Sequence, residues 1–318
     1  MLDVPLWVTE HPGDLQHPDA RSWTFCKVPP VGVLIPRSLE DAVAALVEHP
    51  DALVLAGGTD VMVEVNEARL RVSGDDIVVA VGRVPELRTW THDPIARTVR
   101  LGAGVTYAEI EREPLASLLP ALAQAARTVG SPQIRNAATI GGNLATCSPA
   151  GDGLPVLSAL DAVVELAGAS GPRSVPVGAF MTGVKRTDRR PDELITAVTI
   201  PLLDGWQGYA KVGVRNAMVI AIAGACLAVD RPGRSIRLAL GSVAPTIVRA
   251  AEAETYASAL VDWDALTVDE AVTREFGRLA GAAARPIDDH RASAAYRSHA
   301  VEVLARRLLR RAFPRLDP

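Results

Sequence analysis

The chain of 318 residues has few cysteines, and none is placed for metal or disulfide chemistry. The three that occur, Cys26, Cys147 and Cys226, are far apart and form no CxxC pair. This spacing excludes the usual iron–sulfur and structural zinc motifs, and we expect a reducing, cytoplasmic setting. The six histidines show no metal-binding spacing such as HxxxH. The sequence therefore predicts no metal site.

An excess of positive charge and a long apolar run are also missing. The net charge is -4 and the isoelectric point about 5.9, so no global positive field exists for nucleic acid or an anionic membrane. The apolar run Met218–Val229 has 12 residues, whereas a membrane helix needs about 20. The first residues lack a basic segment followed by an apolar one, so no signal peptide is expected. We expect no nucleic-acid partner and no membrane span.

Two common nucleotide-binding motifs are absent, since no GxGxxG follows a strand and no GxxxxGK[ST] occurs. Two glycine pairs are present instead, in Ala56-Gly57-Gly58-Thr59-Asp60 and in Thr139-Ile140-Gly141-Gly142-Asn143. Glycine can adopt positive φ and bring its N–H group close to another body. Successive inward-pointing N–H groups form a concavity that binds anions. From these residues alone, both structural turns and a two-sided pyrophosphate cradle remain open.

The first half of the chain has the pattern of an α/β fold. Residues 1–30 show no clear period and are predicted to be an irregular arm. Ser38 followed by Asp41 marks a helix start, and apolar residues at helical spacing continue to Leu46. A strand is expected at 52–56, directly before the first glycine pair. The order helix, strand, glycine turn is typical of α/β structure.

The same kinds of signal continue to about residue 202. Thr106 and Glu109 form a second capping box. Further strands are expected at 77–81, 98–101, 162–166 and 194–200, and helices at 115–129 and 154–160. We therefore place a two-part α/β domain at 31–202.

The pattern changes near residue 203. Three strand-like runs follow one another at 208–214, 219–229 and 236–243, and then three helical runs at 250–261, 268–284 and 290–312. Strands followed by helices, without alternation, indicate α+β structure. We therefore predict a second domain at 203–318, with three antiparallel strands and about three helices, and an α+β class overall.

The segments around the glycine pairs resemble one family. They are QIRNAATIGGNLATCSPAGD at 133–152, the upstream AGGTD, and Asp289…Arg291-x-Ser293-x-x-Tyr296-Arg297 near the C-terminus. Together they resemble the FAD-binding medium subunit of the molybdenum hydroxylases, the family of xanthine dehydrogenases and aerobic carbon monoxide dehydrogenases. The likeness runs from about residue 33 to 312. It implies an FAD-binding domain of the p-cresol methylhydroxylase type, followed by a carbon monoxide dehydrogenase flavoprotein-like C-terminal domain.

The resemblance also implies roles for particular residues. Both glycine segments would hold the FAD pyrophosphate, and Asn143, Thr146 and Asp152 would lie along the ribityl chain or near the flavin ring. Lys211 and Arg215 would lie close to the ring, where a cation stabilises an anionic reduced flavin.

Alternative interpretations follow from the residue types. Lys211 is equally compatible with an exposed position on a strand, and Asp60 with a loop-fixing residue that accepts backbone N–H bonds. Cys147 is expected to be a small buried side chain. The C-terminal arginines are expected to form a solvated or partner-docking helix face, with Glu302 pairing with Arg306.

For function, the resemblance implies a subunit that carries electrons. It would take them from a [2Fe-2S] small subunit and pass them to NAD, a quinone or O2, while a molybdopterin large subunit oxidises the substrate. The alternative is a free-standing FAD-dependent oxidoreductase that acts directly on a small organic, biosynthetic substrate. The long arm and the Asn216-Ala217-Met218 segment, where the family often has acidic residues, leave room for this alternative. A scaffold that has lost flavin is the third possibility, and the intact glycine segments argue against it.

Overall fold

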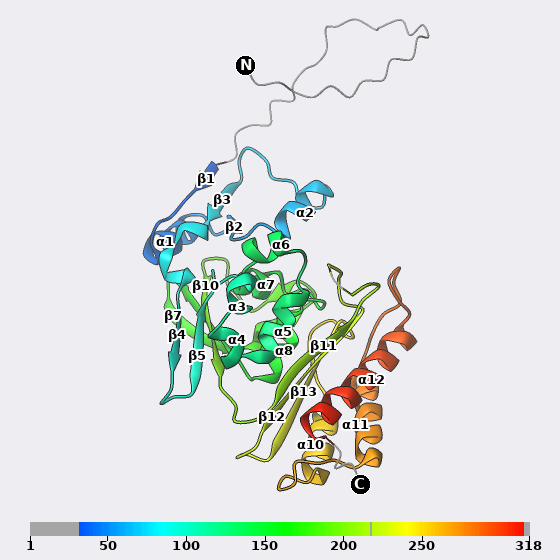
Figure 1. The fold of residues 1–318 in the computed structure, drawn as a ribbon. Coiled ribbons are helices and arrows are strands. Elements are labelled where there is room, and N and C mark those ends of the chain that lie inside the picture. The colour runs from blue at the N-terminus through cyan, green and yellow to red at the C-terminus, as the bar shows by residue number, and fades with distance from the viewer. Residues whose placement is uncertain (1–31, 217, 315–318) are drawn as a thin grey trace, which may run out of the picture.

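The computed structural model describes residues 32–216 and 218–314 and has mixed helix and strand content (Figure 1). The predicted arm at 1–30 lies outside the described residues. A three-stranded sheet, a five-stranded sheet and a two-stranded hairpin, with their helices, form the part before residue 203. A four-stranded sheet with three long helices follows. The expected α+β class and the succession of two domains are confirmed.

A small parallel sheet begins the described chain. Its order is β1-β3-β2, with β1 at Gly32–Leu34, β2 at Leu53–Leu55 and β3 at Ile77–Ala80. Helix α1 (Leu39–Glu48) starts as predicted, because Ser38 Oγ accepts a hydrogen bond of 3.0 Å from the Asp41 N–H. Helix α2 (Val61–Asn66) follows the first glycine pair. We call this the N-terminal part.

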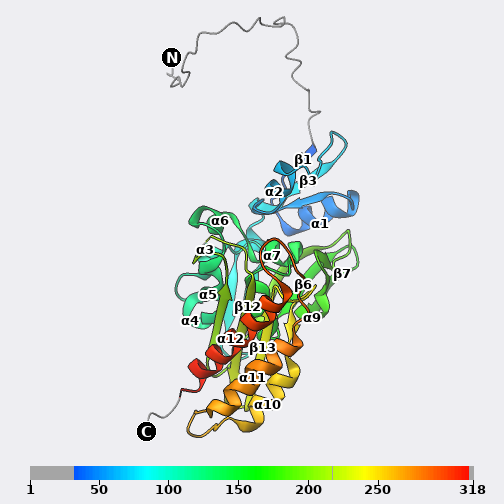
Figure 2. The ribbon, with the colours of Figure 1, turned by 90° about the vertical axis from the view of Figure 1, so that its right-hand side faces the viewer.

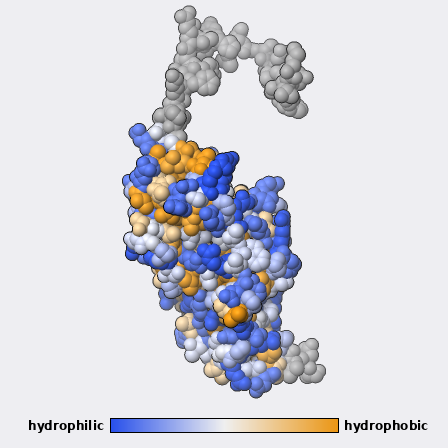
Figure 3. Space-filling model, turned by 90° about the vertical axis from the view of Figure 1, so that its left-hand side faces the viewer, coloured by the Kyte–Doolittle hydropathy of each residue, from blue (hydrophilic) through white to orange (hydrophobic). Residues whose placement is uncertain are grey.

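Apolar side chains gather over the N-terminal part at the upper end of the face in Figure 3. Val33 and Leu34 of β1, with Ile35 after it, are exposed, as is Val47 of α1. Strand β1 is an edge strand, because only β3 pairs with it. The N-terminal part therefore leaves more of its apolar side chains exposed to solvent than the central part of the molecule does.

A five-stranded antiparallel sheet forms the centre. Its order is β4-β5-β10-β6-β7, with bounds Trp90–Asp93, Thr98–Gly102, Leu194–Pro201, Val163–Gly168 and Gly171–Pro176. The three inner strands were expected. The edge strands β4 and β7 carry polar residues and proline, so their sequences show little of the apolar alternation that indicates a strand.

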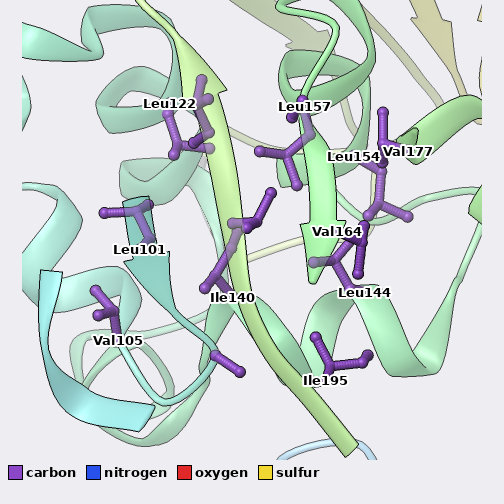
Figure 4. Packing of buried hydrophobic residues seen from close by; sticks show 14 of the residues in the cluster. Leu101, Val105, Leu122, Ile140, Leu144, Leu154, Leu157, Val164, Val177 and Ile195 are labelled. Atoms are coloured by element: carbon purple, nitrogen blue, oxygen red, sulfur yellow. The ribbon is translucent and has the colours of Figure 1, made fainter. Parts of the chain in front are cut away.

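Short helices cover this central sheet. They are α3 (Tyr107–Ile110), α4 (Leu115–Leu118), α5 (Pro120–Thr128), α6 (Pro132–Ala137), α7 (Ile140–Thr146), α8 (Gly153–Ala159) and α9 (Val177–Phe180), and two 3₁₀ turns, Val81–Arg83 and Pro85–Arg88, precede them. The capping box at Thr106 is confirmed. The single helix expected at 115–129 is two helices, because Pro120 lacks the N–H that would continue the first. Figure 4 shows the apolar contacts of Ile140, Leu144 and Leu157 beneath these helices.

The C-terminal sheet has four antiparallel strands, one more than predicted. They are β11 (Gln207–Val212), β12 (Ala223–Asp230), β13 (Ser235–Gly241) and β14 (Val248–Arg249). The fourth strand has two residues, too few for a periodic signal. The three helices expected after the strands are present as α10 (Ala251–Leu260), α11 (Glu270–Ala283) and α12 (Ala294–Ala312), and they lie over one face of this sheet (Figure 2). Helices α5 and α8 pack on the other face (Figure 1).

Strand β12 explains the long apolar run of the sequence from Ala223 onward, whereas Met218 and Ile220 before it are exposed. Cys226 and Ala228 belong to the core shared with the central helices, whereas Ala225 and Leu227 belong to the core under α10–α12. A strand buried on both faces has an unbroken apolar sequence. Within residues 32–216 and 218–314, no helix is long and apolar enough to cross a membrane.

Candidate functional site

A cavity of about 930 Å³ opens between the N-terminal part and the helices over the central sheet. Most of the predicted site residues line it: Ala56, Gly57, Gly58, Thr59, Asp60, Thr139, Gly141, Gly142, Asn143, Thr146 and Asp152. Ile140 does not, because it is fully buried in the core. The fold therefore brings the two glycine segments, about 80 residues apart in sequence, to one cavity of the size that ligand sites have.

The first glycine segment presents backbone donors to the cavity. The N–H groups of residues 57–60 donate no hydrogen bond to any described residue. Gly58 has a φ of 71°, a left-handed conformation that favours glycine. Gly57 touches the end of α6, where an added Cβ would lie 1.9 Å from the Ala137 carbonyl oxygen. A run of unpaired N–H groups on a cavity wall is suited to an anion.

The second segment is the first turn of α7, whereas the sequence suggested a glycine loop. Thr139 caps the helix, and its Oγ1 accepts from the Gly142 N–H at 3.0 Å. The Ile140 and Gly141 N–H groups donate to the carbonyls of Val105 and Ala103. These N–H groups therefore already have protein acceptors.

The two glycines of this turn differ in their surroundings. A Cβ on Gly141 would lie 2.5 Å from the Ala103 Cβ, so Gly141 is required for close packing. A Cβ on Gly142 would meet only Thr139 Oγ1, at 3.1 Å, and Gly142 lines the cavity. Neither has positive φ. Gly142 therefore provides a surface that another molecule can approach closely.

Two side-chain contacts connect the N-terminal part to the rest of the cavity wall. Thr146 Oγ1 donates to Asp60 Oδ2 at 2.8 Å. Asp60 makes no capping bond to the start of α2, so the expected local loop-fixing role is replaced by a contact across the cavity. Lys185, in the hairpin of β8 (Met181–Gly183) and β9 (Arg186–Thr187), pairs with Glu64 of α2. The hydrogen bond from Lys185 lowers the pKa of Glu64.

Asp152 and Lys211 form a buried ion pair of 2.7 Å. The Lys211 side chain is only 6% exposed, so the alternative of an exposed strand lysine is wrong. Its ammonium also donates to the Thr128 and Val219 carbonyls, each at 3.0 Å, which uses all three N–H groups. Asp152 accepts in addition from Tyr209 at 2.7 Å. Burial raises the pKa of the Tyr209 phenol, and the charge of Asp152 raises it further.

Lys211 and Arg215 do not line the cavity, but both hold a segment that does. Lys211 bonds the Val219 carbonyl, and Arg215 donates to the Met218 carbonyl at 2.5 Å. Met218, Val219 and Ile220 lie in the cavity wall. The role of the two cations at a flavin ring stays a prediction.

Two site features carry no clear signal in the sequence. Tyr107 lines the cavity, and its hydroxyl donates to Asn143 Oδ1 at 2.7 Å. Arg135, in the QIRN motif, contacts Glu111 and donates to the Gly130 carbonyl at 3.1 Å. Arg135 therefore fixes α6 beside the cavity. The capping box before Tyr107 predicts its helix but not where its hydroxyl points.

Cys147 and the C-terminal motif are structural. Cys147 is 2% exposed, as expected, and burial raises the pKa of its thiol. Arg297, also buried, donates to the Ile222 and Ser242 carbonyls and to Asp289, which fixes the start of α12 against the C-terminal sheet. The described residues contain no group of His, Cys, Asp and Glu side chains that could hold a metal ion.

The basic face of α12 packs partly against its neighbour. Arg306 and Arg310 both contact Glu270 of α11. The predicted pair of Glu302 with Arg306 is therefore wrong, because Arg306 pairs between helices instead of along its own helix.

Comparison with sequence families identifies both halves of the chain. The FAD-binding domain of molybdopterin dehydrogenases matches residues 29–203, and the C-terminal domain of carbon monoxide dehydrogenase flavoproteins matches residues 209–312. The chain belongs to the FAD subunits of the molybdopterin dehydrogenases. It is an FAD-dependent oxidoreductase subunit.

Relatives of this FAD subunit cover nearly all of it. The glyceraldehyde dehydrogenase medium chain of Sulfolobus acidocaldarius is 32% identical over 84% of this chain and 92% of the relative. The carbon monoxide dehydrogenase medium chain of Hydrogenophaga pseudoflava is 31% identical over 88% and 96%, respectively.

Solved structures agree in fold. A carbon monoxide dehydrogenase structure from Hydrogenophaga pseudoflava aligns over 91% of this chain and all of that chain, with a TM-score of 0.78 and 28% identity. Quinoline 2-oxidoreductase from Pseudomonas putida 86 aligns over 90% and 98%, with a TM-score of 0.81. At 24% identity this second likeness concerns the fold alone.

The cavity of this FAD subunit has the donors that FAD needs. The unpaired N–H groups of residues 57–60 suit the phosphates, and the bare face of Gly142 allows close approach. The Asn143 amide adds a neutral donor to the wall of the same cavity. The residues present therefore fit the cofactor of the family.

Proposed function

We propose that this FAD subunit takes electrons from a [2Fe-2S] partner chain of a molybdenum hydroxylase-type dehydrogenase and passes them to a small-molecule acceptor such as NAD, a quinone or O2. The observation that carries the proposal is the cavity whose wall presents the unpaired N–H groups of residues 57–60. The names of the relatives, medium chains of carbon monoxide and glyceraldehyde dehydrogenases, support a subunit role.

The chain's own residues would bind and enclose the cofactor. FAD, when bound, supplies a ring that accepts electrons and releases them again. Residues 57–60 bind phosphate oxygens through backbone N–H groups. Met218–Ile220, held by Lys211 and Arg215, cover one side and exclude water there. The Asp152–Lys211 pair fixes that cover to the helices beneath.

The proposed division of labour places FAD binding mainly in residues 31–202, with 203–318 supplying the cover and the partner contacts. The described residues offer no metal-holding cluster, so iron and molybdenum would be bound by partner chains. A [2Fe-2S] small subunit and a molybdopterin large subunit are the expected partners.

The deciding experiment is purification of the full-length chain from its native host under mild conditions. We expect FAD on this chain and iron and molybdenum in the same complex, measured by absorption and elemental analysis. A chain that carries FAD but runs alone, and that is reduced directly by a small organic compound, would overturn the subunit role and establish the free-standing alternative.

The acceptor is tested on the purified complex after anaerobic reduction by the enzyme's own substrate. Reoxidation of the flavin is followed after addition of NAD, a quinone or O2 in separate runs. We expect one acceptor to reoxidise the flavin at least as fast as the complex turns over. Failure of all three would contradict the proposed electron path.

A further inference from the structure

Asn143 accepts a hydrogen bond from a buried tyrosine. The Tyr107 hydroxyl lies 2.7 Å from Asn143 Oδ1, and Tyr107 is 1% exposed. The Tyr107 N–H donates to the Ala138 carbonyl, just before the helix that carries Asn143. The phenol is therefore fixed in place by its own backbone and by the packing around it.

The direction of this hydrogen bond fixes the orientation of the amide. Burial raises the pKa of the Tyr107 phenol, and the charges of Asp152 and Asp60 raise it further, so the hydroxyl keeps its proton. Among the described residues, Asn143 is its acceptor. A hydroxyl that donates must face the amide oxygen, because the amide nitrogen has no free acceptor site. The Asn143 NH2 group therefore points the other way.

That other side is open to the cavity. Nδ2 of Asn143 has no hydrogen-bond acceptor within residues 32–216 and 218–314. It is also absent from the fully buried polar atoms that lack a partner in these residues, so it is accessible from the cavity. Asn143 and Gly151 both line the cavity. A side-chain amide whose oxygen is satisfied and whose nitrogen is unpaired offers donors to a ligand.

Two glycines leave the space for this arrangement. A Cβ on Gly151 would lie 2.7 Å from Asn143 Nδ2, so any side chain there would press on the donor. A Cβ on Gly153 would lie 2.6 Å from the Tyr107 hydroxyl and 3.1 Å from Asn143 Oδ1. The Gly151-Asp152-Gly153 sequence therefore accommodates the tyrosine–asparagine pair on both sides.

We propose that Tyr107 is a positioning residue for the cofactor: it orients the Asn143 amide so that Nδ2 donates to a hydrogen-bond acceptor of FAD. Tyr107 acts through Asn143. Without the hydrogen bond from Tyr107, the Asn143 amide could rotate by half a turn and present its oxygen to the cavity instead of its NH2 group. This inference deepens the proposed function and rests on FAD as the ligand.

The test is a double-mutant cycle on FAD affinity, with apoprotein titrated by flavin fluorescence. Tyr107→Phe and Asn143→Ala should each weaken binding about tenfold, as loss of one oriented hydrogen bond does. The double variant should bind no more weakly than Asn143→Ala, because the tyrosine then has nothing to orient. Unchanged affinity in Tyr107→Phe, or additive losses near a hundredfold in the double variant, would overturn the inference.

Asn143→Asp separates positioning from a structural role. It keeps an oxygen for Tyr107 but replaces the donor with a second oxygen, so apoprotein stability should hold while FAD binding falls at least tenfold. An Asn143→Asp variant that binds FAD like the wild type would also overturn the inference. Tyr296→Phe, the same change at an exposed tyrosine outside the cavity lining, is the matched control and should bind FAD normally. A wild-type chain that fails to bind FAD would instead refute the cofactor assignment itself.

Discussion

In Gly57-Gly58 and Gly141-Gly142, the same dipeptide is followed by polar residues and reaches the same cavity. Their backbone N–H groups nevertheless have different partners. Those of the first pair have no acceptor among the described residues, whereas those of the second bond to Ala103 and Thr139. A glycine pair in a sequence thus indicates where side chains must be missing. It does not indicate whether the missing side chain makes room for a ligand or for the protein itself.

Within each pair the two glycines also differ. Gly57 and Gly141 face other parts of the chain at distances that no side chain allows. Gly58 needs a left-handed backbone, and Gly142 faces the cavity. Each pair therefore combines one packing glycine with one that shapes the site, and substitutions can separate the two roles.

The largest effect is expected from Gly57→Ala. The new Cβ would lie 1.9 Å from the Ala137 carbonyl oxygen, so the N-terminal part must shift away from α6. Overpacking against fixed backbone should lower the free energy of unfolding by about 3 kcal/mol, measured by urea denaturation of the apoprotein. Gly178→Ala in α9, where an added Cβ meets nothing within 4 Å, is the control and should not lower the free energy of unfolding, because alanine favours a helix by up to about 1 kcal/mol. Equal stability of both variants would show that Gly57 has no packing role.

Gly141→Ala should have the next largest effect. The clash with Ala103 should lower the free energy of unfolding by about 3 kcal/mol. The better helix propensity of alanine should raise it by about 1 kcal/mol, so the net decrease is about 2 kcal/mol. Adding Ala103→Gly removes the nearest atom, 2.5 Å away, and should restore part of the loss in the same denaturation assay. No recovery in the double variant would mean that the clash lies elsewhere.

The sequence predicted features whose causes are local. Ser38 with Asp41, and Thr106 with Glu109, form caps from residues three apart, and both helices begin there. The hydrogen-bond partners of the N–H groups in the second glycine segment are not local, because the acceptor carbonyls of Ala103 and Val105 come from another part of the chain. A sequence pattern cannot contain this information, and the second segment was therefore expected to resemble the first.

The burial of Lys211 illustrates the same limit. Its three acceptors come from Thr128, Asp152 and Val219, which only the fold brings together. The residue type and its strand position were compatible with an exposed side chain. Tyr107 was missed for a similar reason, since its partner is 36 residues away.

Gly142→Ala should separate binding from folding. Its Cβ would meet only Thr139 Oγ1, at 3.1 Å, and alanine favours the helix, so the free energy of unfolding should change by less than about 1 kcal/mol. The same methyl group would occupy the cavity wall, so FAD affinity should fall about tenfold, or about 1.4 kcal/mol. Normal FAD binding in this variant would remove Gly142 from the cofactor site.

The smallest effect is expected from Thr146→Val, which keeps the side-chain shape but removes the hydrogen bond to Asp60. An exposed hydrogen bond contributes about 1 kcal/mol, so the two glycine segments should be held together less firmly and FAD affinity should fall about fivefold. Thr255→Val, which loses a hydroxyl bonded only within α10, is the control and should bind FAD normally. In the Thr146→Val background, Asp60→Ala should cause little further loss if the contact acts by joining the two segments. A large additional loss would mean that Asp60 contacts the cofactor itself, and the first glycine segment would then contribute a side chain to the site as well as its backbone.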